Sequence, residues 1–302
     1  MKLSIVTINY NNCKGLQDTF ESVKNQFFHD FEYIVIDGGS SDGSKEIIES
    51  NSQIINYWVS EKDRGIYHAM NKGILASNGE YLLFLNSGDT LYNNKVLEEV
   101  NSLLAEDDII SGNMVSLKSN GIIENISSPK EMTFEVMYFS SLSHPSTFIK
   151  KELFFSIGMY DEELKIVSDW KWFLYAKFLH NVSYRMIDNV ISKFREDGIS
   201  SDFNNQSRAN LERQKTLQEF FKNYCNEGDF LINSLVNNED TNLLIPMLKS
   251  RNEEFKKYFS IILSNYSKST TTIYKYDDLE RSRLFKIFMR LNIFLKSLKS
   301  TR

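Results

Sequence analysis

The feature that most constrains the fold is an apolar run, Tyr81–Leu85, which stops abruptly at the polar turn Asn86-Ser87-Gly88-Asp89. A short apolar run bounded by turn residues is typical of a strand buried on both faces. The preceding residues Gly65–Ser77 carry apolar side chains at helical spacing, which predicts a helix that leads into this strand. Ligands of open α/β sheets bind beyond the carboxyl ends of the strands, so this turn is the first candidate binding site.

Strand and helix patterns alternate through the first two thirds of the chain. We expect further strands and helices at Leu3–Ile8, Leu16–Gln26, Glu32–Ile36, Ser44–Glu49, Ile54–Val59 and Asp108–Ile110. This alternation predicts an α/β fold built from βαβ units, with a mainly parallel central sheet flanked by helices. The pattern continues to about Ser201, so we place one α/β domain at residues 1–207.

Residues 208–302 show helical patterns and no convincing strand pattern, so we expect them to form a helical C-terminal region. Their last segment, 281–302, contains seven basic residues and no acidic one, and its apolar side chains share one helical face. A basic amphipathic helix suits an anionic membrane surface. The same stripe could instead pack against the protein's own helices, so both interpretations stay open.

Composition excludes several classes of protein. The chain has 302 residues, 41% of them hydrophobic and 25% charged, which is ordinary for a folded soluble protein. The net charge of -5 argues against a general nucleic-acid binder, so we expect no nucleic-acid partner. The two cysteines lie too far apart in sequence to suggest a disulfide framework or a cysteine zinc site. We see no signal peptide and no run of about 18 apolar residues, which predicts a reduced, cytoplasmic protein.

Polar side chains gather where the predicted strands end. The segment Gly38–Gly43 does not fit a dinucleotide-binding fingerprint, and the Lys-Ser/Thr of a P-loop is missing. What remains is a series of amide and carboxylate side chains: Asn9, Asn11, Asp37, Asp42, Asp63 and Asp89. Carboxylates suit nucleoside hydroxyls and bases, and they repel phosphate unless a cation intervenes. Each residue alone could equally be a turn former or a helix cap.

An ordered series of motifs resembles the family-2 glycosyltransferases with the GT-A fold, which are inverting enzymes that use nucleotide-sugar donors. The matching stretches are SIVTINYN, VIDGGSSDGS, EKDRGIYHAMNKGI, NSGD, SHPSTFIKKELF, GMYDEEL, SDWKWF and FREDGISS. The resemblance covers about residues 1–201, and the order of the series makes it specific.

The resemblance implies donor-binding roles for residues at or near the strand ends: Thr7, Asn9, Asn11, Asp37, Asp63, Arg64, Asn86 and Arg195. It implies that the first three line the nucleoside pocket, and that Asp37 accepts a hydrogen bond from the base, usually uracil. Asp63 and Arg64 would lie near the nucleotide. Arg195 would meet the diphosphate from a closing loop.

The resemblance also implies a divalent cation, Mn²⁺ or Mg²⁺, held by Asp89 in the position of the family's DXD motif. Here the chain departs from the usual form, because Asn86 and Gly88 stand where acidic residues are common. The protein's contact with the metal would then rest on Asp89, with diphosphate oxygens and waters completing the coordination. We therefore expect weak metal binding without nucleotide.

On the acceptor side, Asp169 matches the family's catalytic base. A sugar hydroxyl becomes an effective nucleophile when a carboxylate within hydrogen-bond reach takes its proton. The alternative is that Asp169 only caps the helix that follows. His144 and Trp170 are the other acceptor-side candidates, His144 in a turn expected to open toward the cleft and Trp170 as a floor for a sugar. The alternative for both is a structural role, since a lone histidine is more often structural and a tryptophan at helical spacing can equally belong to the core.

The leading hypothesis is a GT-A catalytic domain at residues 1–207 that transfers a sugar, hexosyl or N-acetylhexosaminyl, from a nucleotide donor such as a UDP-sugar. The acceptor would be a hydroxyl of a glycan or a lipid-linked glycan in cell-surface polysaccharide biosynthesis. Residues 281–302 would then contact the inner face of the membrane peripherally. The alternatives are a nucleotidyltransferase of similar fold and a non-catalytic nucleotide-sugar-binding protein.

Overall fold

The computed structural model describes residues 1–118, 121–133, 136–137, 140–195, 198 and 205–219. The chain divides into two compact units, Met1–Arg213 and Gln214–Arg302. Most of the predicted helical region 208–302, including the basic segment 281–302, lies outside the described residues. The predicted boundary after residue 207 therefore stays a prediction.

A nine-stranded sheet forms the centre of the described structure, in the order β3-β2-β1-β4-β8-β6-β9-β5, with β7 paired to β6. The strands are β1 Leu3–Asn9, β2 Glu32–Asp37, β3 Tyr57–Ser60, β4 Tyr81–Phe84, β5 Thr90–Leu91, β6 Ile109–Leu117, β7 Ile123–Ile126, β8 Thr147–Lys150 and β9 Tyr184–Arg195. The first four in this order pair in parallel, as expected from the βαβ pattern. In the other half, β6 and β9 are parallel while β5, β7 and β8 are antiparallel to their neighbours.

The strands of the parallel half lie close to their predicted positions, whereas β5, β7, β8 and β9 were not predicted. Three of these four have only two to four residues, too few to show a period. The long β9 alternates poorly, and it is ordered through its pairing with β6 and β5. A strand defined by distant partners leaves little local signal in the sequence.

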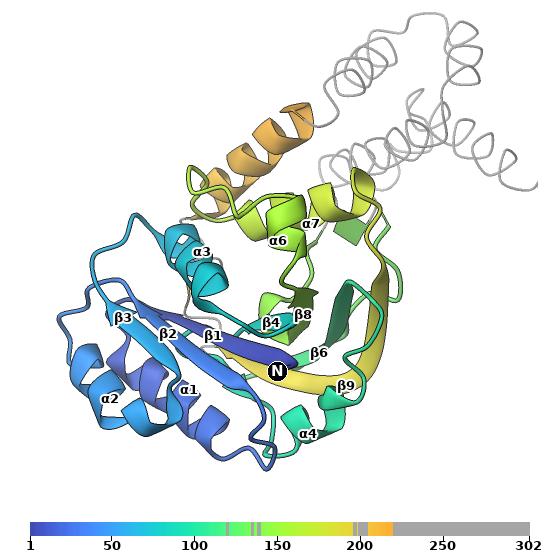
Figure 1. The fold of residues 1–302 in the computed structure, drawn as a ribbon. Coiled ribbons are helices and arrows are strands. Elements are labelled where there is room, and N and C mark those ends of the chain that lie inside the picture. The colour runs from blue at the N-terminus through green and yellow to red at the C-terminus, as the bar shows by residue number, and fades with distance from the viewer. Residues whose placement is uncertain (119–120, 134–135, 138–139, 196–197, 199–204, 220–302) are drawn as a thin grey trace, which may run out of the picture. The chain divides into compact units, whose positions relative to one another are not determined.

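Helices cover both faces of the sheet: α1 Cys13–Lys24, α2 Ser44–Ser50, α3 Ile66–Ala76, α4 Val96–Asn101, α6 Leu153–Ser156 and α7 Ser168–Phe178. Two 3-10 turns, η1 Ser52–Ile54 and η2 His144–Ser146, connect elements, and residues 206–219 are helical. Figure 1 shows α1, α2 and α4 on one side of the sheet and α3, α6 and α7 on the other. Among the described residues, no helix has the length and apolar character needed to cross a bilayer.

The core forms around β1, whose seven residues are all buried. The helix α3 lies very close to this strand, since a Cβ added to Gly73 would stand 2.4 Å from a methyl group of Val6. Glycine at position 73 therefore sets how near α3 can approach the sheet. This approach fixes the loop before α3, which carries part of the candidate site.

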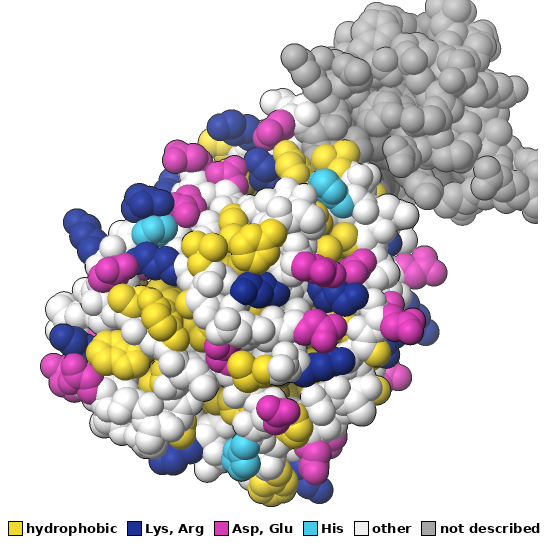
Figure 2. Space-filling view, in the orientation of Figure 1, with side chains coloured by type: hydrophobic (Ala, Val, Ile, Leu, Met, Phe, Trp, Pro, Cys, Tyr) yellow, Lys and Arg dark blue, Asp and Glu magenta, His cyan; other side chains and the backbone are white. Residues whose placement is uncertain are grey.

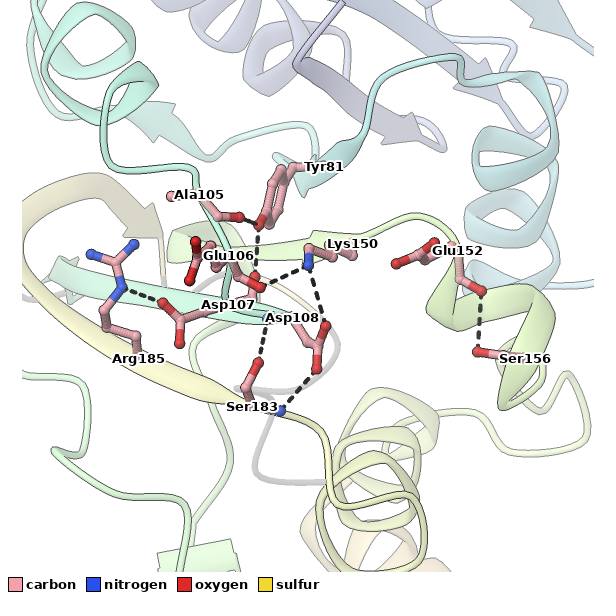
Figure 3. A network of polar contacts seen from close by, with 10 residues as sticks. All are labelled: Tyr81, Ala105, Glu106, Asp107, Asp108, Lys150, Glu152, Ser156, Ser183 and Arg185. Carbon is pink, nitrogen blue, oxygen red and sulfur yellow. Dashed lines mark hydrogen bonds and ion pairs between the residues drawn. The ribbon is translucent and has the colours of Figure 1, made fainter.

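A polar network ties four strands together at the edge opposite the carboxyl ends of β1 and β4 (Figure 3). The Tyr81 hydroxyl at the start of β4 donates to the carbonyls of Ala105 and Asp107. The Asp108 carboxylate accepts from the Ser183 backbone N–H at 2.9 Å and contacts Lys150 Nζ at 3.4 Å. Burial and the nearby charge of Glu80 raise the pKa of Tyr81 to about 12, so the phenol stays a neutral donor.

Charged side chains of both signs are interspersed over the face seen in Figure 2. Several form ion pairs, such as Lys72 with Glu61 at 2.7 Å and Lys171 with Asp161 at 3.1 Å. Pairs of this kind near the surface contribute about 0–1 kcal/mol each, so the fold depends mainly on its buried sheet.

Tyr81→Phe should lower the free energy of unfolding by about 0.5–1.5 kcal/mol, because it removes the phenol donor from the carbonyls of Ala105 and Asp107. Tyr57→Phe is the matched control, since Tyr57 is 46% exposed and its change should cost less than about 0.5 kcal/mol. Urea unfolding of both variants measures the difference. Equal effects would show that the network does not stabilise the fold.

Candidate active site

The carboxyl ends of the parallel strands form one polar edge. β1 ends at Asn9, β2 at Asp37 and β3 at Ser60, and the strand register pairs Asn9 with Asp37 and Asp37 with Ser60. Three polar side chains therefore stand side by side where a ligand of an α/β sheet is expected.

Asp37 lies at the centre of this row and is fully buried. Its Oδ1 accepts from Asn9 Nδ2 at 2.7 Å and from the Ser40 hydroxyl at 2.5 Å. Its Oδ2 accepts from the Ser60 hydroxyl at 2.6 Å and from the backbone N–H groups of Ser40 and Gly39. The carboxylate thus holds the loop after β2 in place. The hydrogen bond from a base to Asp37 stays a prediction, and it would have to share or displace one of these contacts.

Asp37 should make stability depend on pH. Burial alone would raise its pKa, but the hydrogen bonds from Ser40, Ser60 and Asn9 outweigh it and hold the pKa below the ordinary value. A lowered folded-state pKa gives stability that is present above the unfolded pKa, about 3.9, and lost as pH falls through the folded value. The difference in unfolding free energy between wild type and Asp37→Asn should therefore shrink between about pH 6.5 and about pH 3. The exposed Asp30→Asn is the control, and a difference that stays constant with pH would contradict the assignment.

Two amide oxygens at this edge lack partners. Asn9 is 4% exposed, and neither its Oδ1 nor Oδ1 of Asn86 has a hydrogen-bond partner among the described residues. The two residues end or follow β1 and β4, which are paired neighbours. A buried acceptor without a donor costs about 1–3 kcal/mol, so natural structures usually supply a water, ligand or ion. These oxygens are therefore candidate ligand acceptors.

Thr7 lies on β1, two residues before the end of the strand. Its side chain is fully buried, and its hydroxyl donates to the Leu85 carbonyl at 2.7 Å and contacts the Tyr33 hydroxyl at 3.0 Å. The hydroxyl therefore ties β1 to the residue after β4 inside the core. The expectation that Thr7 lines the nucleoside pocket stays a prediction, and a ligand there would meet a hydroxyl that already has two partners.

The loop after β1 provides exposed groups. Asn11 adopts φ +48°, and its Oδ1 accepts from the Ser41 backbone N–H at 2.9 Å, which joins the loops after β1 and β2. Tyr10 is 66% exposed, and its ring would stand 3.1 Å from a Cβ added to Gly38. Sequence reasoning missed Tyr10 as a candidate. The signal was available, since an aromatic ring in an otherwise polar strand-end loop can stack on a planar ligand.

Asp63 and Arg64 occupy the loop before α3. Asp63 Oδ1 accepts from the Gly65 backbone N–H at 2.9 Å, and its Oδ2 would be 2.5 Å from a Cβ added to Gly38. Only glycine at position 38 leaves room for this carboxylate at the end of β2. The Arg64 side chain is 70% exposed and pairs with Glu162 at 2.5 Å. An exposed pair is weak, so Arg64 is available to other anions, and its contact with nucleotide stays a prediction.

The NSGD turn is held against α1. It closes with a 2.9 Å hydrogen bond from the Asp89 backbone N–H to the Asn86 carbonyl, and Gly88 adopts φ +103°. The Thr19 hydroxyl accepts from the Gly88 N–H at 3.0 Å and donates to the Asp89 carbonyl at 2.8 Å. Asn12 Nδ2 donates to the Ser87 carbonyl at 2.9 Å. Sequence reasoning missed both supports, because Thr19 lies within the predicted helix and Asn12 caps the start of α1.

The donor set near Asp89 suits a hard divalent cation only in part. Among the described residues, no group of three or more His, Cys, Asp and Glu side chains could hold a metal ion. The turn offers the Asp89 carboxylate and the unpaired amide oxygen of Asn86, and oxygen donors fit Mg²⁺ or Mn²⁺. A cation at this turn would need further oxygens from a ligand or water.

Asp169 lies in the first turn of α7, and no side chain caps this helix. Its Oδ1 accepts from the Tyr67 hydroxyl at 2.9 Å, which joins α7 to α3. Its charge acts on His144, whose ring centroid is 4.8 Å from that of Phe84 at the end of β4. Asp169 therefore makes no capping hydrogen bond to α7. It lies near the carboxyl end of β4, on the α3 side of the sheet.

His144 and Trp170 were expected to face an acceptor, and both are buried instead, His144 at 8% and Trp170 at 1% exposure. His144 Nε2 meets the Tyr160 hydroxyl at 2.8 Å, and burial lowers the pKa of the imidazole, with the Asp169 charge opposing. Trp170 Nε1 donates to the Met137 carbonyl, and the Arg213 guanidinium lies 4.8 Å from its ring centroid. Both side chains are thus enclosed by neighbours from other segments, and contact of either with an acceptor stays a prediction.

Arg195 lies at the end of β9 and pairs with Asp18 of α1 at 3.2 Å. It lines a groove of about 740 Å³ between α1 and β9 that reaches the NSGD turn at Gly88. Asp37 and Asp169 are not among the residues that line this groove. The diphosphate contact expected of Arg195 stays a prediction.

The fold and the site together define an α/β protein with a row of polar side chains at the carboxyl ends of its parallel strands and with Asp169 on a neighbouring helix. The profile described as Glycosyl transferase family 2 matches residues 4–156. The chain therefore belongs to this family and is a glycosyltransferase. An uncharacterized glycosyltransferase of Mycobacterium tuberculosis is 30% identical over 210 residues, which cover 66% of this chain and 77% of the relative. The PGL/p-HBAD biosynthesis glycosyltransferase of Mycobacterium bovis is 25% identical over 201 residues, covering 65% and 77%.

Solved structures share the fold. S. aureus TarS superposes with a TM-score of 0.53 at 23% identity, over 65% of this chain and 37% of that longer chain. A TarS structure of residues 1-349 gives the same score and identity, with 61% of its chain covered. The predicted membership of the family-2 glycosyltransferases and the predicted GT-A fold are confirmed.

Proposed function

We propose that this glycosyltransferase moves a hexosyl or N-acetylhexosaminyl group, with inversion, from a UDP-sugar to a hydroxyl of a glycan or lipid-linked glycan. The proposed setting is cell-surface polysaccharide biosynthesis. The name of the Mycobacterium bovis relative, a PGL/p-HBAD biosynthesis glycosyltransferase, supports a glycoconjugate product. TarS 1-349 has been solved with UDP and with UDP-GlcNAc, which makes UDP the nucleotide to test first.

The observation that carries the proposal is the convergence of the motifs at one edge of the sheet. The residues Asn9, Asp37 and Asn86 end or follow parallel neighbouring strands. Asp169 is hydrogen-bonded to Tyr67, whose ring packs on Tyr160, and Tyr160 in turn packs on Phe84 at the end of β4. The strand β8 starts at the same edge. A donor bound across the strand ends would thus have a carboxylate beside it that can take a proton.

On the donor side, the unpaired oxygens of Asn9 and Asn86 would accept from base or sugar hydrogens, and the exposed Tyr10 ring would stack on the base. Asp37 would act mainly by holding the loop that positions Asn9. Arg64 and Arg195 would approach the diphosphate after leaving their exposed partners. Asn11 and Asp63 would shape the pocket between the loops after β1 and β2.

In the transfer step, Asp169 takes the proton of the acceptor hydroxyl while the acceptor oxygen forms a bond to the anomeric carbon. The bond from that carbon to the diphosphate breaks, and the diphosphate leaves with the electron pair. Attack opposite the leaving group inverts the anomeric configuration. A Mn²⁺ or Mg²⁺ ion held by Asp89, with Asn86 beside it, would supply positive charge to the diphosphate.

Asp169→Asn should lower transfer by about 10²–10⁴-fold, because the amide cannot take the proton, while donor binding stays near wild type. The measurement is nucleotide release from a panel of UDP- and GDP-sugars with glycan acceptors. Asp188→Asn, at an exposed position of β9, is the control. Full activity of Asp169→Asn would remove it as the base, and activity with nucleoside triphosphates alone would favour a nucleotidyltransferase.

Asp89→Ala should abolish the metal-dependent part of UDP binding, since the NSGD turn has no second carboxylate. Calorimetry of UDP with and without Mn²⁺ measures it, with Asp188→Ala as the matched control. An equal metal enhancement in Asp89→Ala would place the cation elsewhere.

A lipid-linked acceptor would be consistent with contact between the basic segment 281–302 and the inner face of the cell membrane. This part of the proposal rests on the sequence pattern, seven basic residues beside an apolar stripe. It places the protein in the cytoplasm with peripheral membrane contact.

A further inference from the structure

A buried tyrosine from another element meets the proposed base. Tyr67, in the first turn of α3, is 4% exposed and donates its hydroxyl to Asp169 Oδ1 at 2.9 Å. Burial, the charge of Asp169 and this hydrogen bond raise the pKa of Tyr67 well above its ordinary value. The phenol therefore keeps its proton and remains a donor to the carboxylate.

The other charged and titratable groups around Asp169 come from three further segments: His144 in η2, Tyr160 in the loop before α7, and Arg213 in the helix of residues 206–219. Burial lowers the pKa of His144, and it raises that of Tyr160 well above its ordinary value. The Tyr160 hydroxyl contacts His144 Nε2 at 2.8 Å. Among these groups, Tyr67 makes the hydrogen bond that orients the Asp169 carboxylate.

We propose that Tyr67 is a positioning residue, whose hydroxyl holds Oδ1 of Asp169 so that Oδ2 is the oxygen that receives the acceptor's proton. This inference rests on the proposed role of Asp169 as the base. A carboxylate on a short side chain rotates broadly about its last torsion, so one anchored oxygen fixes the direction of the other. During transfer, the proton moves from the acceptor hydroxyl to Oδ2, and Tyr67 keeps its own proton throughout.

The chain offers a matched control for the missing hydroxyl. The rings of Tyr67 and Tyr160 lie 5.8 Å apart, and both residues are nearly fully buried. Their hydroxyls face different partners, Asp169 for Tyr67 and His144 for Tyr160. Tyr67→Phe and Tyr160→Phe therefore remove the same atom from similar surroundings, and only the first removes a contact to the base.

Tyr67→Phe should lower kcat by about 10–100-fold, the range expected for a lost hydrogen bond to a charged group. The KM for the donor should stay near wild type, because the Tyr67 hydroxyl does not touch Asn9, Asp37 or Asn86, the residues proposed to bind or position the donor. Tyr160→Phe should change kcat less than about threefold, even where it lowers the melting temperature. Unchanged kcat in Tyr67→Phe, or an equal loss in both variants, would overturn the proposal. Counting active sites by UDP binding corrects for any unfolded fraction.

The double variant separates this inference from the proposed function. If Tyr67 acts through Asp169, then Tyr67→Phe should cost no further activity in the Asp169→Asn background. A further loss of the same size there would show that Tyr67 acts independently, which would overturn the inference alone. Full activity of Asp169→Asn by itself would instead overturn Asp169 as the base.

Discussion

The pairing of β1 with β2 on one side and with β4 on the other is the constraint on which the rest of the structure depends. Because these strands run in parallel, their carboxyl ends reach the same edge and bring Asn9, Asp37 and the NSGD turn together. The burial of all seven β1 residues makes this register stable, since a shift by one residue would turn its apolar side chains around. The proposed donor-binding edge of the sheet is thus a consequence of how the strands pack.

Asp37 and Asp169 have the same side chain but different roles, because the protein donates a different number of hydrogen bonds to each carboxylate. Asp37 accepts five hydrogen bonds from its own chain and stabilises a loop. Among the described residues, Asp169 accepts one side-chain hydrogen bond, from Tyr67, and a carboxylate has capacity for more. A carboxylate that must receive a proton needs such an open position, whereas a structural one is stabilised by filling every position.

A rigid aromatic wall stands behind the proposed base. His144, Tyr160, Phe154 and Trp172 pack ring against ring, with Phe154 and Trp172 stacked at 4.6 Å. Close-packed rings move little, so the first turn of α7 is held firmly against β4 and α3. His144, an acceptor-side candidate from the sequence, is part of this wall.

The sequence alone determined the parallel half of the sheet, the turn after β4 and the family, because these depend on local periodicity and on an ordered set of motifs. The tertiary structure decided which polar residues are available to a ligand. Thr7 and Trp170 carry suitable chemistry and are buried, which the sequence did not show, while the exposed Tyr10 and the buried Tyr67 gain their significance from neighbours far away in the chain. Exposure and hydrogen-bond capacity are properties of the packed molecule, and no local pattern encodes them.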